Sequence, residues 1–203
     1  MASNYDKMEQ LARSLFLQQD QEQIIRRWDL RCDRENIYLR LFSDPLKLSR
    51  KTAVLSPDGE GYPMRSTVNE SMILFDILTR SPERPRAAGV WTSISGLGGI
   101  IGASHDRTLS HNKEAALFTG GTERLRNACE RLGGVPCGKA DVGYVIPVFA
   151  DFSVLFQFWD ADEEFPAQIK YHFDANALLF MHYETLWYVM SGVMDRLRRL
   201  FGQ

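Results

Sequence analysis

The chain has 203 residues, of which 44% are hydrophobic and 25% are charged. These proportions are ordinary for a globular protein, and a chain of this length buries roughly 70% of its unfolded surface without needing disulfides or a metal. The 24 basic and 26 acidic side chains give a formal net charge of −2. That balance argues against nucleic acid as a main partner, and it provides no broad attraction to anionic membranes.

Three widely spaced cysteines indicate a reducing compartment. Cys32, Cys129 and Cys137 are odd in number and form no CxxC motif, so they predict neither a disulfide framework nor a structural zinc site. The first 20 residues suit a polar amphipathic helix and lack the apolar core of a signal peptide. No apolar run approaches the roughly 20 residues that cross a bilayer. We therefore expect a cytoplasmic protein with no membrane partner.

The first 30 residues have the pattern of a helical segment. Apolar side chains recur every three or four positions over residues 6–18, which is helical spacing. A second short helix is expected over residues 21–28, where three apolar side chains fall on one side.

The pattern then changes to strict alternation. Ile37, Leu39 and Leu41 point to one face of a predicted strand. We expect Asp44-Pro45 to turn the chain into a second strand over residues 47–55, which would complete a hairpin.

Two helices are predicted in the middle of the chain. Thr67 opens a capping-box sequence ahead of an apolar run, which predicts a mostly buried helix over residues 68–79. A second helix is expected to be capped by Thr122 and to end at Gly133-Gly134. Between them, residues 93–104 are rich in glycine, but no parallel-strand pattern follows, so a turn is favoured over a nucleotide-binding loop.

The last part of the chain, residues 142–203, predicts an antiparallel three-strand meander and a closing helix. Strands are expected over residues 142–148, 154–159 and 168–174. Pro147 cannot donate to a ladder, so its strand should lie at an edge or carry a bulge.

The order of these elements predicts the α+β class rather than an alternating βαβ chain. We expect residues 1–203 to form a single domain, with an N-terminal helical segment over residues 1–30. The meander and closing helix over residues 142–203 would pack against several helices.

The densest polar cluster lies between the last two predicted strands, where residues 160–164 contain four carboxylates in five positions. Alternation along the third strand puts Lys170 and His172 together on its less buried face. A slip of one residue would place both in the core. The expected pairs are Trp159 with Gln168, Gln157 with Lys170, and Leu155 with His172.

Carboxylates so close repel one another, and a cation would relieve the repulsion. Oxygen-rich loops suit calcium, magnesium or manganese. Three interpretations stay open: a solvated hairpin loop, a metal or substrate site, and a patch that docks a basic protein. The candidate metal ligands are Glu163, Glu164 and His172. The candidate binding residues are Trp159, Asp162, Glu163, Glu164, Lys170, His172 and Asp174.

Several of these residues also carry a resemblance. Pro147, Trp159, the block 162–166 (DEEFP) and Phe173-Asp174, followed by a helix led by Glu184, are similar to the pattern of a family of uncharacterised prokaryotic proteins. That family is found mainly in anaerobic bacteria and archaea and is catalogued as a domain of unknown function. The likeness extends over about residues 20–200, and residues 93–104 and His182 depart from the family's pattern.

Some members of this family carry an added cysteine-rich segment for an iron–sulfur cluster. That segment is absent here, so no cluster is carried over and the cofactor stays unknown. The resemblance implies an accessory or binding domain in anaerobic metabolism, linked by analogy alone to corrinoid or one-carbon redox systems.

Our leading hypothesis from the sequence is a cytosolic accessory or ligand-binding domain whose partner is a small molecule or a protein. It follows from a well-formed scaffold with no recognisable nucleophile–base pair. The alternative is a small metal-dependent enzyme that uses the acidic loop 160–164 with His172 and Asp174.

Overall fold

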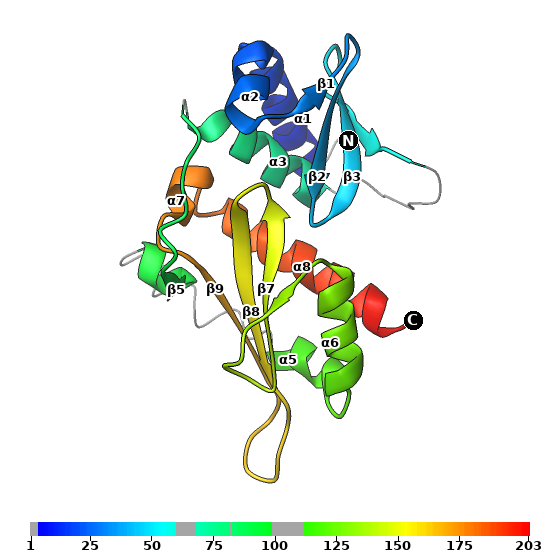
Figure 1. The fold of residues 1–203 in the computed structure, drawn as a ribbon, viewed down its shortest axis with the longest axis vertical. Helices are drawn as coiled ribbons and strands as arrows, with labels where there is room; N and C mark the ends of the chain where they lie inside the picture. The colour runs from blue at the N-terminus through cyan, green and yellow to red at the C-terminus, as the bar shows by residue number, and fades with distance from the viewer. Residues whose placement is uncertain (1–3, 60–67, 82, 99–111) are drawn as a thin grey trace. The chain divides into compact units, whose positions relative to one another are not determined.

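The chain divides into two compact units, seen in a computed structural model (Figure 1). The first comprises Met1–Arg86 and Leu179–Gly192, and the second comprises Ala87–Leu178 and Val193–Gln203. The structure describes residues 4–59, 68–81, 83–98 and 112–203. Within those ranges, no helix is both long enough and apolar enough to cross a membrane.

The helices of the first unit match the predicted amphipathic segments. They are α1 (Asn4–Leu17), α2 (Gln21–Trp28), α3 (Val68–Arg80) and the first part of α8 (Thr185–Phe201). Helix α2 begins where the Asp20 carboxylate accepts the Gln23 backbone N–H at 3.1 Å, which satisfies one of the unpaired donors of its first turn. Thr67, the predicted cap of α3, lies outside the described residues.

The sheet of the first unit is antiparallel, in the order β1-β2-β3-β4. The strands are β1 (Arg31–Cys32), β2 (Asn36–Leu41), β3 (Asp44–Ser49) and β4 (Leu55–Pro57). Helices α1, α2 and α3 lie together beside this sheet (Figure 1). Ile37, Leu39 and Leu41 are buried, so the predicted face of β2 is confirmed.

The predicted turn of this hairpin is wrong by two residues. Phe42 and Ser43 both have positive φ, 51° and 70°, and they form the two-residue turn between β2 and β3. Their backbone twist matches that of the flanking strands, which is why a hairpin favours it. Pro45 lies inside β3 opposite Arg40, and the expected strand over residues 47–55 is split between β3 and β4.

The second unit has a five-stranded antiparallel sheet in the order β5-β9-β8-β7-β6. Its strands are β5 (Trp91–Ser93), β6 (Val135–Pro136), β7 (Val142–Phe149), β8 (Phe152–Trp159) and β9 (Gln168–Asp174). Figure 1 shows β7, β8 and β9 side by side, with the β8–β9 loop projecting from one end. The predicted meander is confirmed, and so is the bulge, because the β7–β8 register shifts between Pro147 and Phe149.

Helices of the second unit pack on this sheet. Helix α6 (Thr122–Arg131) contacts β7 and α5 (Asn112–Ala115) contacts β9. Gly121, rather than Thr122, occupies the N-cap of α6. This unit also contains the 3-10 turn η1 (Ala116–Phe118), the first two residues of the short α7 (Ala177–Phe180) and the last part of α8.

The α+β class and the C-terminal meander are therefore confirmed, whereas the assignment of residues 1–203 to one domain stays a prediction. In the glycine-rich stretch, residues 94–98 are helical, and residues 99–104 lie outside the described part of the chain.

Candidate functional site

The β8–β9 hairpin has the predicted register. Trp159 pairs with Gln168, Gln157 with Lys170, and Leu155 with His172. Lys170 is exposed and His172 half-buried, and the alternate side chains of β9 are buried, so the predicted faces are also correct.

Two of the four loop carboxylates bind backbone N–H groups. The Asp160 carboxylate accepts from Gly120 at 3.0 and 3.1 Å and from Ala161 at 2.8 Å. The Asp162 carboxylate accepts from Phe165 at 2.7 Å and from Glu164 at 2.8 Å, and these bonds, that from Phe165 first, lower the pKa of Asp162. These two side chains therefore shape the loop.

The predicted binding residues are spread along the hairpin. The Lys170 ammonium lies 5.1 Å from the ring centre of Trp159, within the range of a cation–π contact. His172 lies further along β9, opposite Ser93 of β5. At about 3.3 Å per residue, four residues of strand separate His172 from the first residue of β9 by about 13 Å. Glu163 and Glu164 are exposed in the loop that precedes that residue.

Asp174 lies at the far end of β9 and is buried. Its carboxylate accepts three backbone N–H groups, from Ala88, Gly89 and Asn176, each at 2.8 Å. It thus holds the segment that leads into β5 and the turn that follows β9, away from the acidic loop.

His172 is the predicted residue whose environment is most unusual. Its pKa is lowered, mainly because burial disfavours the charged imidazolium and then because of the Lys170 ammonium. Its Nδ1 is buried without a hydrogen-bond partner among the described residues. Over those same residues, no three or more His, Cys, Asp or Glu side chains gather as metal ligands, so the proposed metal set stays a prediction.

A second candidate site lies in the first unit, in a groove of about 390 Å³. One wall is the outer face of α1, where Met8, Leu11 and Leu15 remain 45%, 61% and 48% exposed. Leucines and methionine at this helical spacing normally face a core, so a contiguous exposed stripe of them marks an interaction surface. The groove is lined by Met8, Leu11, Ala12, Leu15, Met72, Phe75, Asp76, Thr79, His182, Glu184, Thr185 and Tyr188.

The floor of the groove is α3, which packs against α1. Phe75 is buried there, and its ring centre lies 5.6 Å from that of Phe16 on α1. This contact sets the spacing of the two helices below the exposed stripe.

One end of the groove is polar and tightly hydrogen-bonded. The carboxylate of Asp76, on α3, accepts the imidazole Nδ1 of His182 at 2.5 Å and the backbone N–H of His182 at 2.7 Å. The Thr185 hydroxyl donates to the same carboxylate at 2.5 Å. The Asp76 side chain is only 10% exposed, whereas that of His182 is 57% exposed.

These bonds determine which nitrogen of the ring is basic. Because Nδ1 faces the carboxylate, Nδ1 carries the proton in the neutral ring and Nε2 carries the lone pair. The guanidinium of Arg80, one turn beyond Asp76, lies 2.8 Å from Nε2 and donates to it. Asp76, His182 and Arg80 thus form a connected polar array beside an apolar groove.

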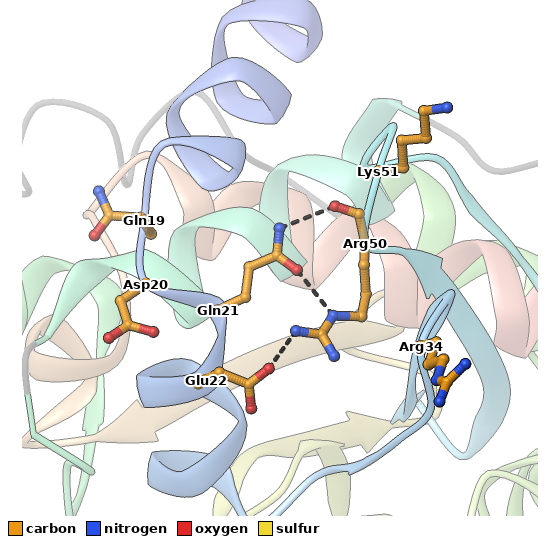
Figure 2. A pocket seen from close by; sticks show the side chains of 7 residues that line it. All are labelled: Gln19, Asp20, Gln21, Glu22, Arg34, Arg50 and Lys51. Atoms are coloured by element: carbon orange, nitrogen blue, oxygen red, sulfur yellow. Dashed lines mark hydrogen bonds and ion pairs between the residues drawn. The ribbon is translucent and has the colours of Figure 1, made fainter.

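The first unit also has a larger polar hollow of about 670 Å³, lined by Gln19, Asp20, Gln21, Glu22, Arg34, Arg50 and Lys51 (Figure 2). Figure 2 shows that Arg50 reaches toward Gln21 and Glu22, whereas Lys51 points away from them. Gln21 binds the Arg50 carbonyl at 2.9 Å, and the Arg50 guanidinium binds Gln21, Glu22 and the carbonyl of Asp33. Arg50 therefore joins α2 to the sheet, and this hollow is explained by that structural role.

The Asp76–His182 pair was missed in the sequence. One signal was present: Asp76 interrupts the apolar run of residues 72–78 on a helix expected to be mostly buried, and a buried carboxylate requires a partner. No sequence pattern identifies that partner, because His182 follows the strands of the second sheet in the chain.

Together the fold and this site describe an α+β protein with an apolar groove that ends at a carboxylate–imidazole pair. The chain belongs to the family described as Domain of unknown function (DUF3786), whose model matches residues 20–196. No curated protein and no solved structure matches the chain.

Proposed function

We propose that the protein is a ligand-binding domain whose first unit takes a small amphipathic molecule in the groove between α1 and α3. The observation that carries the proposal is the apolar stripe of Met8, Leu11 and Leu15 facing a floor that ends in the Asp76–His182 pair. Small-molecule sites are typically concave, mostly apolar, a few hundred Å³ in volume, and supplied with a few fixed polar groups. A groove of about 390 Å³ with one polar end has these features.

The apolar wall and the single polar end of the groove define the kind of molecule that it would bind. Its apolar part would cover the side chains of α1 and displace water from them, which is favourable by about 0.8 kcal/mol for each buried methylene. Its polar end would lie near His182, where Glu184 and Tyr188 also line the groove.

Isothermal titration calorimetry with octanol and decanol tests the proposal. Each added methylene should tighten the Kd by roughly fourfold, so decanol should bind about 15 times more tightly than octanol until the groove is full. Leu11→Asp should abolish this binding, because a carboxylate on the stripe would lose its hydration under the ligand.

The matched control is Leu117→Asp. Leu117 lies in η1 of the second unit and is 53% exposed, comparable with Leu11 at 61%. This variant should bind decanol as the wild type does. Equal loss in both variants, or the absence of any chain-length dependence, would count against the groove.

A metal-dependent enzyme is a second candidate. The buried Nδ1 of His172, unpartnered within the described residues, favours it, and the acidic loop 160–164 with Asp174 would supply carboxylates. The engagement of Asp160, Asp162 and Asp174 with backbone N–H groups weighs against it.

Three finer proposals rest on the sequence and the family resemblance. They are a cytoplasmic location, a role in anaerobic corrinoid or redox metabolism, and a protein partner recognised through the acidic loop. Binding of such a protein partner would weaken steeply as the salt concentration rises, because exposed charges are screened.

A further inference from the structure

We propose that His182 is a general base that hydrolyses an ester bound in the groove, with Asp76 as its positioning residue and Arg80 as the stabiliser of the oxyanion. This inference rests on the proposed binding function, because the ester's acyl chain would occupy the same groove. It adds a reaction and a substrate class to that function.

The Asp76 carboxylate holds His182 at two points. It binds Nδ1 at 2.5 Å and the backbone N–H of the same residue at 2.7 Å, so both the ring and the main chain that carries it are fixed. Thr185 donates to the second oxygen of Asp76 and orients the carboxylate in turn. A base oriented by a second group, itself oriented by a third, is the arrangement that nucleophilic and hydrolytic sites use.

The ring that carries the reactive nitrogen is exposed at the groove. His182 is 57% exposed and lines the apolar groove, and its Nε2 bears the lone pair. That lone pair accepts a hydrogen bond from Arg80 at 2.8 Å. A substrate carbonyl oxygen that accepts from the guanidinium would take the place of Nε2 as acceptor, and Nε2 would then be able to receive a proton from water.

The reaction is a simple hydrolysis. The oxygen of a water molecule attacks the ester carbonyl carbon while Nε2 takes one of its protons, and the carbonyl electron pair moves to the oxygen that faces Arg80. The intermediate then collapses: the bond from carbon to the alcohol oxygen breaks, and the imidazolium returns its proton to that oxygen. The products are a carboxylic acid and an alcohol, and no redox partner is required.

The experiment compares the hydrolysis of 4-nitrophenyl acetate and 4-nitrophenyl octanoate by the full chain. The octanoate should be turned over faster, because its acyl chain occupies the groove. His182→Asn separates catalysis from structure. An asparagine amide reaches about as far as Nδ1 and can keep the bond to Asp76, but it has no atom in the place of Nε2. His182→Asn should therefore remain folded and lose about 100-fold or more in rate, the usual contribution of a general base.

Three further variants complete the set. Arg80→Gln should slow hydrolysis by about tenfold or more, because an oxyanion donor is removed. Cys32→Ser, which removes an exposed thiol that 4-nitrophenyl esters can acylate, should leave the steady-state rate unchanged. For Asp76→Asn, a nitrogen-15 spectrum of the imidazole should show protonation shifting away from Nδ1, a change that a merely structural residue would not produce.

The outcomes separate the two proposals. Binding of decanol with no hydrolysis above buffer, or with hydrolysis unchanged in His182→Asn, would overturn the catalytic inference and leave the binding function intact. Absence of decanol binding would overturn the proposed function itself.

Discussion

The imidazole Nδ1 of His182 lies 2.5 Å from the carboxylate Oδ1 of Asp76, although 106 positions separate the two residues in the chain. Asp76 lies on a helix that is otherwise mostly buried, and His182 lies in the turn that precedes α8. Their pairing joins these two segments and at the same time gives the groove its polar end. The residue pair is therefore both a structural connection and the centre of the proposed site.

Asp76→Asn should destabilise the folded protein by about 1–3 kcal/mol, because its carboxylate accepts three hydrogen bonds at a largely buried position. Urea unfolding followed by circular dichroism measures this change. The control is Asp58→Asn, which removes a 3.3 Å surface contact with Arg31 and should change stability by less than about 0.5 kcal/mol. Equal effects in the two variants would show that the Asp76 network contributes little.

Asp162→Ala should release the tip of the acidic loop while leaving the sheet intact. The amide protons of Glu164 and Phe165, which now bind the Asp162 carboxylate, should exchange with solvent markedly faster. Glu163→Gln is the control and should leave both amides protected. Unchanged exchange in Asp162→Ala would mean that the loop is held by other contacts.

The hydrogen bonds from the same two amides should make the stability of the loop depend on pH in the acid range. Their hydrogen bonds, that of Phe165 first, hold the folded pKa of Asp162 below the ordinary 3.8. The stabilisation is therefore present above pH 3.8, and it is lost as the pH falls through the lowered pKa of Asp162 in the folded protein. An NMR titration of the Asp162 carboxyl carbon should show a midpoint below 3.8, and a midpoint above it would contradict the hydrogen bonding.

Tyr144 should make the free energy of unfolding of the protein depend on pH in the alkaline range. Burial, and then the hydrogen bond that its hydroxyl donates to Glu130 at 2.9 Å, raise the pKa of Tyr144 to about 12. The unfolded chain loses this proton near 10, so the contribution of Tyr144 to stability is complete below pH 10 and is lost as the pH rises to about 12. Unfolding free energies measured across that range should fall more steeply for the wild type than for Tyr144→Phe. Parallel curves would contradict the raised pKa.

Metal analysis of anaerobically purified protein tests the second candidate function. Because Asp160 and Asp162 already bind backbone N–H groups, we expect the metal content to be the same in the wild type and in Glu163→Ala. Stoichiometric calcium, magnesium or manganese in the wild type, lost in the variant, would instead support the metal-dependent enzyme.

The sequence was most informative where a single periodicity continues through a whole element. Alternation along β9 predicted the register of the hairpin, because a slip of one residue would have exchanged buried Tyr171 for exposed Lys170. Helical spacing predicted α2 for the same reason, since it buries one face. A capping-box sequence ahead of an apolar run predicted most of α3, which is largely buried.

The sequence failed where a local rule was overridden or where contacts are distant in the chain. Phe42 and Ser43 adopt the left-handed turn between β2 and β3, although neither is a glycine or asparagine, so the turn was misplaced at Asp44-Pro45. The density of charge at residues 160–164 favoured a binding site there, but two of those carboxylates stabilise their own loop. The groove was missed because its walls come from segments more than 100 residues apart, which periodicity alone cannot bring together.

The most direct measurement follows the methionine methyl groups by NMR while decanol is added. Met8 and Met72 line the groove, whereas Met194, buried in the second unit, serves as the internal control. The account predicts that the methyl signals of Met8 and Met72 shift in a saturable manner and that the Met194 signal remains in place. Saturating decanol that leaves Met8 and Met72 unchanged, or that moves Met194 as far as them, would contradict a ligand site between α1 and α3.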